Sequence, residues 1–482
     1  MKFWRLIMTN IKHLQPIILC GGFGARLWPL SKKSSPKQFI KIFKDKSLFE
    51  LTLDKLKHLK NSRDPIIITS EKYRYKIEGI LLERKTKAKL ILEPFSKNTG
   101  AAIFFSSYFA KKNDDLLILP SDHFIENTNE FVKIINFTLC HIQNNKWIVF
   151  GVPPTKPSDS YGHIKFDNQN IIYQKNKNKI FKVLKFIEKP NIDLATSYFE
   201  TKNYLFNSGI FLVNREKVLS SIRQRAFDLY TSCNEVIKTI DLNFTQNTLK
   251  LSCEQFNNIP SISIDYAVLE KESEILCSLF NTHWNDVGSW DSFFNIVNND
   301  NRDQKNLSTL NSQNEVLTSR NRMIATVGVE DLLIVDTQDT TLITKKNNSQ
   351  GLKKLVETLI KSKSRYVENI FYEERPWGSF EILFDSQFCK VKKITILPNR
   401  RISLQYHMRR SEHWFVVSGR AKIYLDGLIF NLNEGKSIDI KKGSKHYVKN
   451  QQKKDLVIIE IQIGDYFGED DIIRLDDPYN RI

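Results

Sequence analysis

Five residues near the start of the chain combine backbone freedom with positive charge. They are Gly21, Gly22, Gly24, Arg26 and Lys37, and they follow a short apolar run that predicts a buried strand. Glycine permits positive φ and lets backbone N–H groups approach a ligand closely, so the pattern favours an anion-binding loop. With fixed positive charge beside that loop, the expected ligand is a polyphosphate. A plain tight turn is the alternative, and the spacing matches neither the Walker loop nor the dinucleotide fingerprint.

An acidic residue follows another apolar run. Asp122 comes soon after Leu116–Leu119. A carboxylate just beyond a buried strand, near a polyphosphate loop, suits Mg²⁺, which prefers oxygen ligands. A helix N-cap is the alternative role for this aspartate.

A second group of potential ligands lies near the C-terminus. Gln405 and His407 are two residues apart, so on a strand both side chains share one face, and Glu412 and His446 follow them. A lone histidine is usually a core or surface residue. Two histidines with glutamine and glutamate at this spacing resemble the paired cupin motifs, with Gln405 in the place of the usual first histidine.

Alternating strand and helix patterns position the first group. Strands are expected at 65–69, 89–92, 116–119 and 147–152, with helices at 46–60 and 99–110. This alternation predicts an α/β, Rossmann-like domain with a parallel sheet and helices on both faces. Ligands of such sheets bind at the carboxyl ends of the strands, where both the glycine loop and Asp122 are expected.

The rest of the chain changes character twice. Residues 299–314 are polar and Asn-rich and predict an exposed linker, followed by short strands within 320–346 and a helix at 352–362. Alternating apolar and polar residues in 398–419 and 435–450 then predict a small antiparallel barrel. The expected domains are an N-terminal extension (1–15), the α/β domain (16–298), a linker and small β connector (299–365) and an all-β cupin, or jelly-roll, barrel (366–482).

Composition narrows the class of protein. The chain has 482 residues, 41% of them hydrophobic, and no apolar run near the roughly 20 residues that a membrane helix needs. Its 6 cysteines are scattered, without a C-x-x-C pair, which is typical of a reducing cytosol and predicts a cytoplasmic protein. The net charge of +18 arises from lysines spread along the chain rather than from a basic block, so no nucleic-acid partner and no membrane partner is expected.

The glycine loop belongs to a longer string. G-G-x-G-x-R-L-W-P-L-S, from Gly21 to Ser31, with P-K-Q-F behind it, resembles the signature loop of sugar-nucleotide pyrophosphorylases, in the version of the mannose-1-phosphate guanylyltransferase branch. Five further motifs resemble this family in order along the chain: E-P-x-x-K-N-T (93–99), L-P-S-D-H (119–123), F-I-E-K-P (186–190), N-S-G-I-F (207–211) and W-N-D-V-G (284–288).

The resemblance implies roles for individual residues. It implies nucleotide binding by Gly21, Gly22, Gly24, Ala25, Glu93 and Asn98, sugar-phosphate binding by Gly162, Glu188, Lys189 and Asn207, Mg²⁺ binding by Asp122 and Asp286, and catalytic roles for Arg26 and Lys37. In isolation, Glu188-Lys189-Pro190 would be an unremarkable solvated turn. Lys97, Ser160 and His163 depart from the family pattern.

The C-terminal motifs resemble type II mannose-6-phosphate isomerase. They are R-P-W-G (375–378), S-L-Q (403–405), E-H-W (412–414) and G-E-D-D (468–471). The resemblance implies a Zn²⁺ or other first-row divalent metal on Gln405, His407, Glu412 and His446, and a substrate-binding, catalytic role for Arg410. Met408, Arg409 and Lys441 depart from the family, but none of them is an expected ligand.

Together the resemblances predict a bifunctional enzyme, with a possible homo-oligomeric state. It would transfer GMP from GTP to mannose 1-phosphate, giving GDP-mannose and pyrophosphate, and interconvert mannose 6-phosphate and fructose 6-phosphate. One alternative keeps only the transferase and a structural cupin. The other is a non-catalytic sugar-nucleotide sensor or a nucleic-acid binder that uses the net charge of +18.

Overall fold

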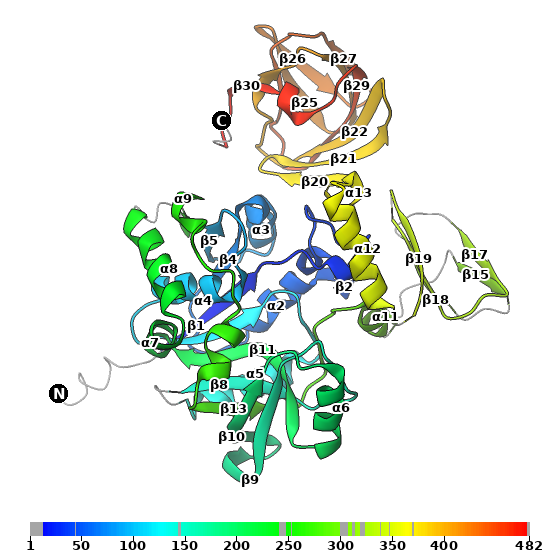
Figure 1. Cartoon of the computed structure of the whole chain (residues 1–482). Helices are drawn as coiled ribbons and strands as arrows, with labels where there is room; N and C mark the ends of the chain where they lie inside the picture. The colour runs from blue at the N-terminus through cyan, green and yellow to red at the C-terminus, as the bar shows by residue number, and fades with distance from the viewer. Residues whose placement is uncertain are drawn as a thin grey trace. The chain divides into compact units, whose positions relative to one another are not determined.

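The computed structural model describes residues 13–43, 45–142, 146–240, 247–251, 253–298, 307–310, 314–318, 323–337, 339–346, 348–368 and 371–479. The chain forms two compact units, the larger built mainly from residues up to Val367 and the smaller mainly from Glu368–Ile482 (Figure 1). The expected extension 1–15 lies outside the described residues as far as position 12, and the first strand begins at Leu14.

A ten-stranded sheet organises the larger unit. Its strands in spatial order are β12 (Thr248–Lys250), β5 (Lys89–Glu93), β4 (Ile66–Ser70), β1 (Leu14–Cys20), β6 (Asp115–Pro120), β11 (Tyr204–Asn214), β8 (Trp147–Val152), β13 (Ile275–Leu279), β10 (Asn178–Ile187) and β9 (His163–Lys175). Strands β12 to β6 are parallel, as the sequence predicts. Strand β11 runs antiparallel to both β6 and β8, so the sheet as a whole is mixed.

Helices cover both faces of this sheet (Figure 1). Helices α4 (Asn98–Phe109), α7 (Arg215–Arg225) and α8 (Phe227–Thr239) share one core with Ile17 of β1 and Val149 of β8. Successive residues of a strand face opposite sides, so Phe150 points to the other face. There its ring contacts Phe280, which in turn contacts Phe131 of α5 (Thr128–Leu139).

The helix expected at 46–60 is shorter in the structure at both ends, and a capping box fixes its start. Helix α2 spans Leu48–Leu56; the Ser47 hydroxyl accepts from the Glu50 N–H, and the Glu50 carboxylate accepts from the Ser47 N–H. The other helices of the α/β part are α3 (Arg74–Glu83), α6 (Ile192–Thr201), α9 (Cys253–Phe256), α10 (Ile264–Ala267) and α11 (Trp290–Asn298).

The connector contains β15 (Leu307–Leu310), β16 (Glu315–Thr318), β17 (Ile324–Val327), β18 (Leu332–Asp336), β19 (Thr341–Lys345), α12 (Ser349–Lys361) and α13 (Arg365–Glu368). The prediction of a linker or exposed loop at 299–314 did not include a strand, whereas Leu307–Leu310 pairs in parallel with β17, because its apolar ends suit a strand. Asn314 is also described, and its side chain bonds to Val329 and Leu332; the other residues of that range lie outside the described part.

The connector packs beneath the signature loop. The Trp28 indole donates to the Tyr366 carbonyl at 3.0 Å, and the Trp290 indole donates to the Trp28 carbonyl at 3.1 Å. Leu352 and Val356 of α12 share a hydrophobic core with Trp28. The W-P-L-S segment (Trp28–Ser31) therefore fixes the glycine-containing segment of the loop against the connector.

Two antiparallel sheets form the smaller unit. One comprises β20 (Tyr372–Arg375), β21 (Gly378–Asp385), β22 (Cys389–Ile396), β29 (Leu456–Gly464), β24 (Arg410–Ser418) and β27 (Ser437–Ile440), and the other comprises β26 (Leu428–Asn433), β25 (Arg420–Leu425), β28 (His446–Asn450), β23 (Leu404–Tyr406) and β30 (Ile473–Asp476). Their inner faces meet in one core that includes Trp414, Ile423, Val448 and Ile458. This confirms the predicted all-β cupin barrel.

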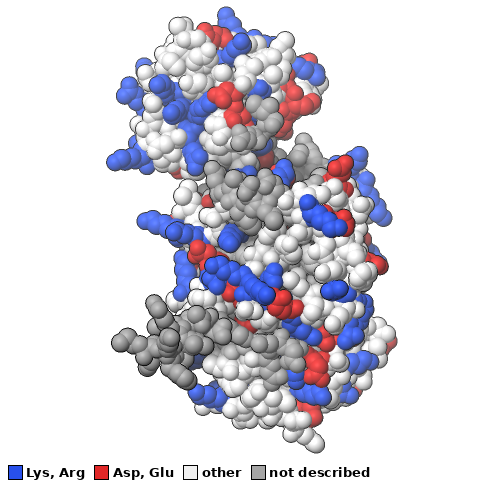
Figure 2. All heavy atoms as spheres, turned by 90° about the vertical axis from the view of Figure 1, so that its left-hand side faces the viewer, with Lys and Arg blue, Asp and Glu red and all other residues white. Residues whose placement is uncertain are grey.

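Lys and Arg side chains are interspersed with Asp and Glu on the face shown in Figure 2. Among the described residues, no helix is both long and apolar enough to cross a membrane.

Candidate active sites

One cavity in the larger unit gathers most of the residues singled out in its sequence motifs. It measures about 540 Å³ and is lined by Gly21, Gly22, Glu93, Asn98, Asp122, Gly162, Glu188, Lys189, Asn207 and Asp286, among others. This volume lies in the range of small-molecule sites, about 300–1,000 Å³. Gly24, Ala25, Arg26 and Lys37 are not part of its lining.

Lys37 lies outside the cavity lining and contacts both Asp122 and Asp286. Its buried ammonium is 2.7 Å from Asp122 Oδ2 and donates to the Asp286 carbonyl at 2.5 Å. Burial alone would raise the pKa of Asp122, but the Lys37 charge holds that pKa below its ordinary value. Gly24 has a φ of 71°, and a Cβ there would lie 2.5 Å from the Lys37 Cβ, so the loop needs glycine at this position.

The second aspartate is held by a residue that the sequence analysis did not assign. The Tyr161 hydroxyl donates to Asp286 Oδ1 at 2.8 Å, and the Gly288 N–H donates to the same oxygen at 3.1 Å. Two donors on one carboxylate oxygen fix the orientation of the group. Tyr161 directly precedes Gly162 in the sequence, but only the fold brings it to a residue 125 positions away.

The far end of the cavity is polar and acidic. Glu188 Oε1 pairs with Lys189 Nζ at 3.0 Å, and a Cβ at Gly162 would lie 2.6 Å from Glu188 Oε2. The Asn207 amide is oriented at both ends, because its oxygen accepts from the Gly209 N–H at 3.1 Å and its nitrogen donates to Asp265 Oδ1 at 3.0 Å.

Asp265 is a second residue without an assigned role in the sequence analysis. It lies in α10 and lines the cavity. Burial and the neighbouring Glu188 carboxylate raise the pKa of Asp265 to about 7. Two carboxylates and an amide thus face the same space, a combination that accepts hydrogen bonds from sugar hydroxyls.

Glu93 marks the opposite end. It ends β5, lines the cavity and is only 3% exposed, and its Oε1 has no hydrogen-bond partner within the described residues. Burial raises the pKa of Glu93 to about 8. Nearby, Lys97 stands in place of the family's arginine and donates to the Asn257 carbonyl at 2.8 Å.

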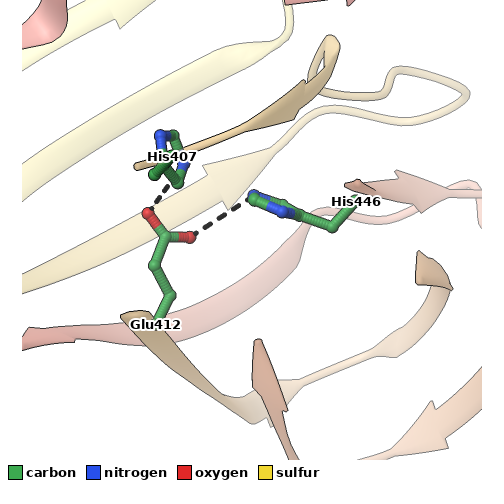
Figure 3. Close-up of side chains that lie close together, drawn as sticks. All are labelled: His407, Glu412 and His446. Atoms are coloured by element: carbon green, nitrogen blue, oxygen red, sulfur yellow. Dashed lines mark ion pairs between the residues drawn. The ribbon is translucent and has the colours of Figure 1, made fainter. Parts of the chain in front are cut away.

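The smaller unit brings His407, Glu412 and His446 together in the barrel (Figure 3). All three are buried, with one ligand atom from each lying within 4.8 Å of the others. His407 Nε2 is 3.1 Å from Glu412 Oε1, and His446 Nε2 is 3.6 Å from Glu412 Oε2. These contacts, chiefly the hydrogen bond from His407, outweigh burial and hold the pKa of Glu412 well below its ordinary value.

This cluster fits a divalent metal ion. Glu412 Oε2 and His446 Nε2 are buried without a hydrogen-bond partner in the described structure, although they face each other. The other ring nitrogens are already used: His446 Nδ1 contacts the Ser444 carbonyl at 2.8 Å and His407 Nδ1 contacts the Asp471 carbonyl at 3.2 Å. Each Nε2 is thereby oriented as a ligand.

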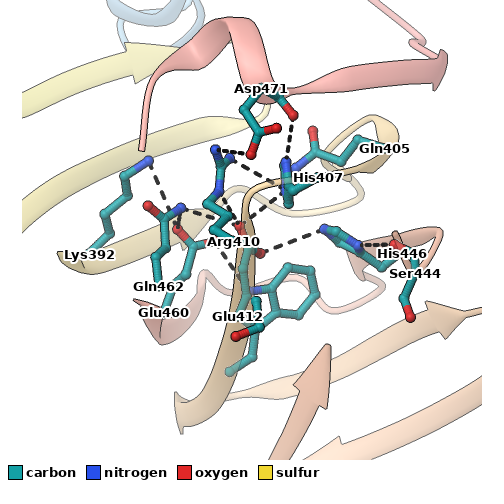
Figure 4. A network of polar contacts seen from close by, with 12 residues as sticks. Lys392, Gln405, His407, Arg410, Glu412, Ser444, His446, Glu460, Gln462 and Asp471 are labelled. Carbon is teal, nitrogen blue, oxygen red and sulfur yellow. Dashed lines mark hydrogen bonds and ion pairs between the residues drawn. The ribbon is translucent and has the colours of Figure 1, made fainter. Parts of the chain in front are cut away.

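Two further predicted residues lie beside the cluster (Figure 4). The Gln405 amide oxygen accepts from the Ser403 hydroxyl at 2.8 Å, and Gln405 is paired with His446 across the strands. Arg410 is 2% exposed and donates to Glu412 Oε1 at 3.2 Å, to the Gly468 carbonyl at 3.2 Å and to Asp471 Oδ2 at 3.4 Å.

Known proteins match the chain along its length. Residues 15–303 match the family described as Nucleotidyl transferase, residues 305–359 match MannoseP isomerase/GMP-like beta-helix domain, and residues 362–477 match Mannose-6-phosphate isomerase C-terminal. The mannose-1-phosphate guanylyltransferase of Salmonella montevideo is 36% identical over 477 residues, which cover 97% of this chain and 100% of that protein.

The chain belongs to the mannose-1-phosphate guanylyltransferase family. The alginate biosynthesis protein AlgA of Pseudomonas fluorescens is another relative, 32% identical over 473 residues that cover 97% of this chain and 96% of AlgA. The crystal structure of mannose-1-phosphate geranyltransferase from Thermus thermophilus has a TM-score of 0.58 at 24% identity, covering 72% of this chain and 99% of that one, and supports the fold.

Replacing Glu93 with glutamine should change how stability depends on pH in this member of the guanylyltransferase family. The unfolded chain ionises Glu93 near pH 4.5, whereas the folded protein keeps the proton until about pH 8. The wild type therefore loses stability from this group as the pH rises between those values. Glu93→Gln stays neutral, so its Tm relative to wild type should rise by several degrees between pH 5 and pH 9. The exposed Glu83→Gln serves as the control, and a pH-independent difference would contradict the assignment.

Removing the Tyr161 hydroxyl tests the predicted Mg²⁺-binding role of Asp286, because that hydroxyl donates to Asp286 Oδ1. A hydrogen bond to a charged group contributes about 1.5–3 kcal/mol, so Tyr161→Phe should raise the Mg²⁺ concentration for half-maximal activity about tenfold or more. Mn²⁺ binding followed by electron paramagnetic resonance should weaken in parallel. Tyr198→Phe, at a ring that stacks on Tyr204, is the matched control. Unchanged metal titrations of Tyr161→Phe would show that Asp286 needs no such anchor.

Proposed function

We propose that this chain transfers GMP from GTP to α-D-mannose 1-phosphate and releases pyrophosphate. The observation that carries the proposal is that the glycine loop, two aspartates and a polar sugar-sized pocket share one cavity of about 540 Å³. A sugar-phosphate oxygen forms a bond to the α-phosphorus of GTP, and the bond from that phosphorus to the pyrophosphate oxygen breaks. No general base is required, because the attacking phosphate is already ionised.

The residues act mainly through charge and position. The Asp122 and Asp286 carboxylates would hold Mg²⁺, which when bound supplies charge neutralisation between the phosphates. Lys37 keeps Asp122 ionised and in place. The loop N–H groups would steady the leaving pyrophosphate, together with Arg26, which follows them in the same loop but lies outside the cavity lining. At the sugar end Glu188, Asn207 and Asp265 would accept or donate to hydroxyls, and Lys189 would pair with the sugar phosphate.

Glu93 supports guanine as the base. The Watson–Crick edge of guanine carries N–H donors at N1 and N2, and an ionised carboxylate accepts such a pair, so guanine binding would displace the proton that burial keeps on Glu93 in the free protein. Glu93 offers a buried oxygen that has no partner among the described residues. Adenine presents an acceptor at N1 and would leave that oxygen unsatisfied.

For the smaller unit we propose interconversion of mannose 6-phosphate and fructose 6-phosphate. His407, Glu412 and His446, with Gln405 beside them, would hold Zn²⁺ or another first-row divalent ion, which supplies polarisation of the substrate's carbonyl and hydroxyl oxygens. Arg410 would orient the substrate from within the barrel. A structural cupin remains the competing function, since the cavity beside the cluster is only about 50 Å³ here.

Pyrophosphate release tests the transferase. Purified protein with mannose 1-phosphate and Mg²⁺ should release pyrophosphate with GTP at least tenfold faster than with ATP, CTP or UTP. Equal rates with all four would overturn the base assignment, and no release from folded protein would favour the sensor alternative.

In a separate assay, mannose 6-phosphate should yield fructose 6-phosphate only after the protein is loaded with a divalent metal; no conversion in any metal form would support a structural cupin.

A further inference from the structure

A group of cations lines the cavity next to the His407–Glu412–His446 cluster. The cations are Arg375, Lys392, Arg410 and Arg474, and they share the cavity with Glu412, Glu460, Gln462 and Glu469. Figure 4 shows Lys392, Glu460 and Gln462 beside Arg410 and Glu412. Arg375, Lys392 and Arg474 have no assigned role, although their charge is concentrated in a site that holds one buried metal-ligand cluster.

We propose that Arg375, Arg474 and Lys392 form a binding seat for the phosphate monoester of a hexose phosphate, and that the Glu469 carboxylate fills this seat when no substrate is bound. The inference rests on the proposed isomerase function and adds the part of the site that binds the substrate's phosphate.

Glu469 bridges the two arginines. Its Oε2 lies 3.3 Å from Arg375 Nη2 and 3.8 Å from Arg474 Nη2. A single carboxylate oxygen between two guanidinium groups occupies the position that a phosphate oxygen would take. The Glu469 side chain is 50% exposed, while each arginine side chain is 21% exposed, so the carboxylate is the more accessible partner.

Local charge favours an anion at this position. Although burial opposes ionisation, Arg375, Lys392, Arg474 and Arg410 together hold the pKa of Glu469 below its ordinary value. A phosphate monoester carries more negative charge than a carboxylate and offers three oxygens, so it makes more charge-assisted hydrogen bonds to the same groups.

Packing fixes the cations before a ligand arrives. The Arg375 guanidinium lies 5.6 Å from the centre of the Phe380 ring, and Lys392 Nζ lies 4.8 Å from the same ring. Arg375 and Lys392 come from β20 and β22 of one sheet, and Arg474 comes from β30 of the other. Because β20 and β22 flank the strand that carries Phe380, one aromatic ring orients two charges.

The binding seat adjoins the His407–Glu412–His446 cluster, as a hexose 6-phosphate requires. Arg410 Nε and Gln462 Nε2 each lie 3.2 Å from Glu412 Oε1 and so separate the seat from the cluster by one layer of side chains. Gln462 is buried, and its Oε1 has no hydrogen-bond partner in the described structure, which leaves an acceptor for a sugar hydroxyl. The reacting C1 and C2 atoms and the 6-phosphate lie at opposite ends of the substrate, so the site needs two separate positions.

Glu469 lies in a short 3-10 turn, Glu469–Asp471, whose last residue is tied down. Asp471 Oδ1 accepts from the Met408 N–H at 3.1 Å, while Glu469 is held by its side-chain ion pairs. Withdrawal of Glu469 would therefore enlarge the cavity of about 50 Å³ without disturbing the residue that supports His407.

Binding of a substrate-like ester that cannot isomerise tests the seat. The full-length, metal-loaded protein is titrated calorimetrically with mannitol 1-phosphate and with mannitol, with saturating GDP-mannose present to occupy the other cavity. We expect Glu469→Gln to bind the phosphate ester several-fold more tightly than wild type, and Arg375→Gln and Arg474→Gln to bind it at least tenfold more weakly. Metal content should be unchanged in all three variants.

Arg409→Gln is the matched control, because Arg409 forms an exposed ion pair with Asp465 at 3.0 Å. Unchanged or weaker ester binding by Glu469→Gln, with only a lower Tm, would show that the carboxylate only stabilises the fold, and would overturn the proposal. Unaltered affinity in Arg375→Gln and Arg474→Gln would do the same. If the wild type binds the ester as predicted but does not isomerise mannose 6-phosphate, the isomerase function fails while the seat stands.

Discussion

The buried ammonium of Lys37 is the contact on which the first active site depends. It joins the signature loop to the Asp122 carboxylate at the end of β6 and to the Asp286 backbone. Burial alone would raise the pKa of the Asp122 carboxyl, because a lone buried charge is unfavourable. The fixed positive charge of Lys37 offsets that cost and holds the pKa of Asp122 below its ordinary value. The connector packs against the same loop through Trp28, whose indole donates to the Tyr366 carbonyl.

The second site also contains a buried carboxylate that neighbouring side chains stabilise, but in a different arrangement. Glu412 is buried in the barrel and is stabilised by His407, His446 and Arg410. Antiparallel strands from two sheets bring these groups together, and backbone carbonyls orient each imidazole. In the first site charged side chains line a cavity of about 540 Å³. In the second site they line a cavity of about 50 Å³, so a substrate would enter it only after side chains rearrange.

Part of this organisation is readable in the sequence, because Gly21 and Asp122 follow the parallel strands β1 and β6, whose carboxyl ends meet at one edge of the sheet. Asn207 lines the same cavity from within the antiparallel strand β11. The antiparallel insertion of β11 was not predictable from local pattern, since its pairing depends on distant strands. The Tyr161–Asp286 hydrogen bond and the Asp265–Asn207 contact were missed for the same reason: motif spacing does not report side-chain contacts across 125 and 58 positions.

We propose that one chain carries two chemically independent sites. Both reactions measured in parallel on Asp286→Asn and His446→Ala test this independence most directly. We expect Asp286→Asn to lose nearly all pyrophosphate release and to keep metal-dependent isomerisation of mannose 6-phosphate, while His446→Ala shows the reverse. Loss of both reactions in either variant, with Tm close to wild type, would contradict it.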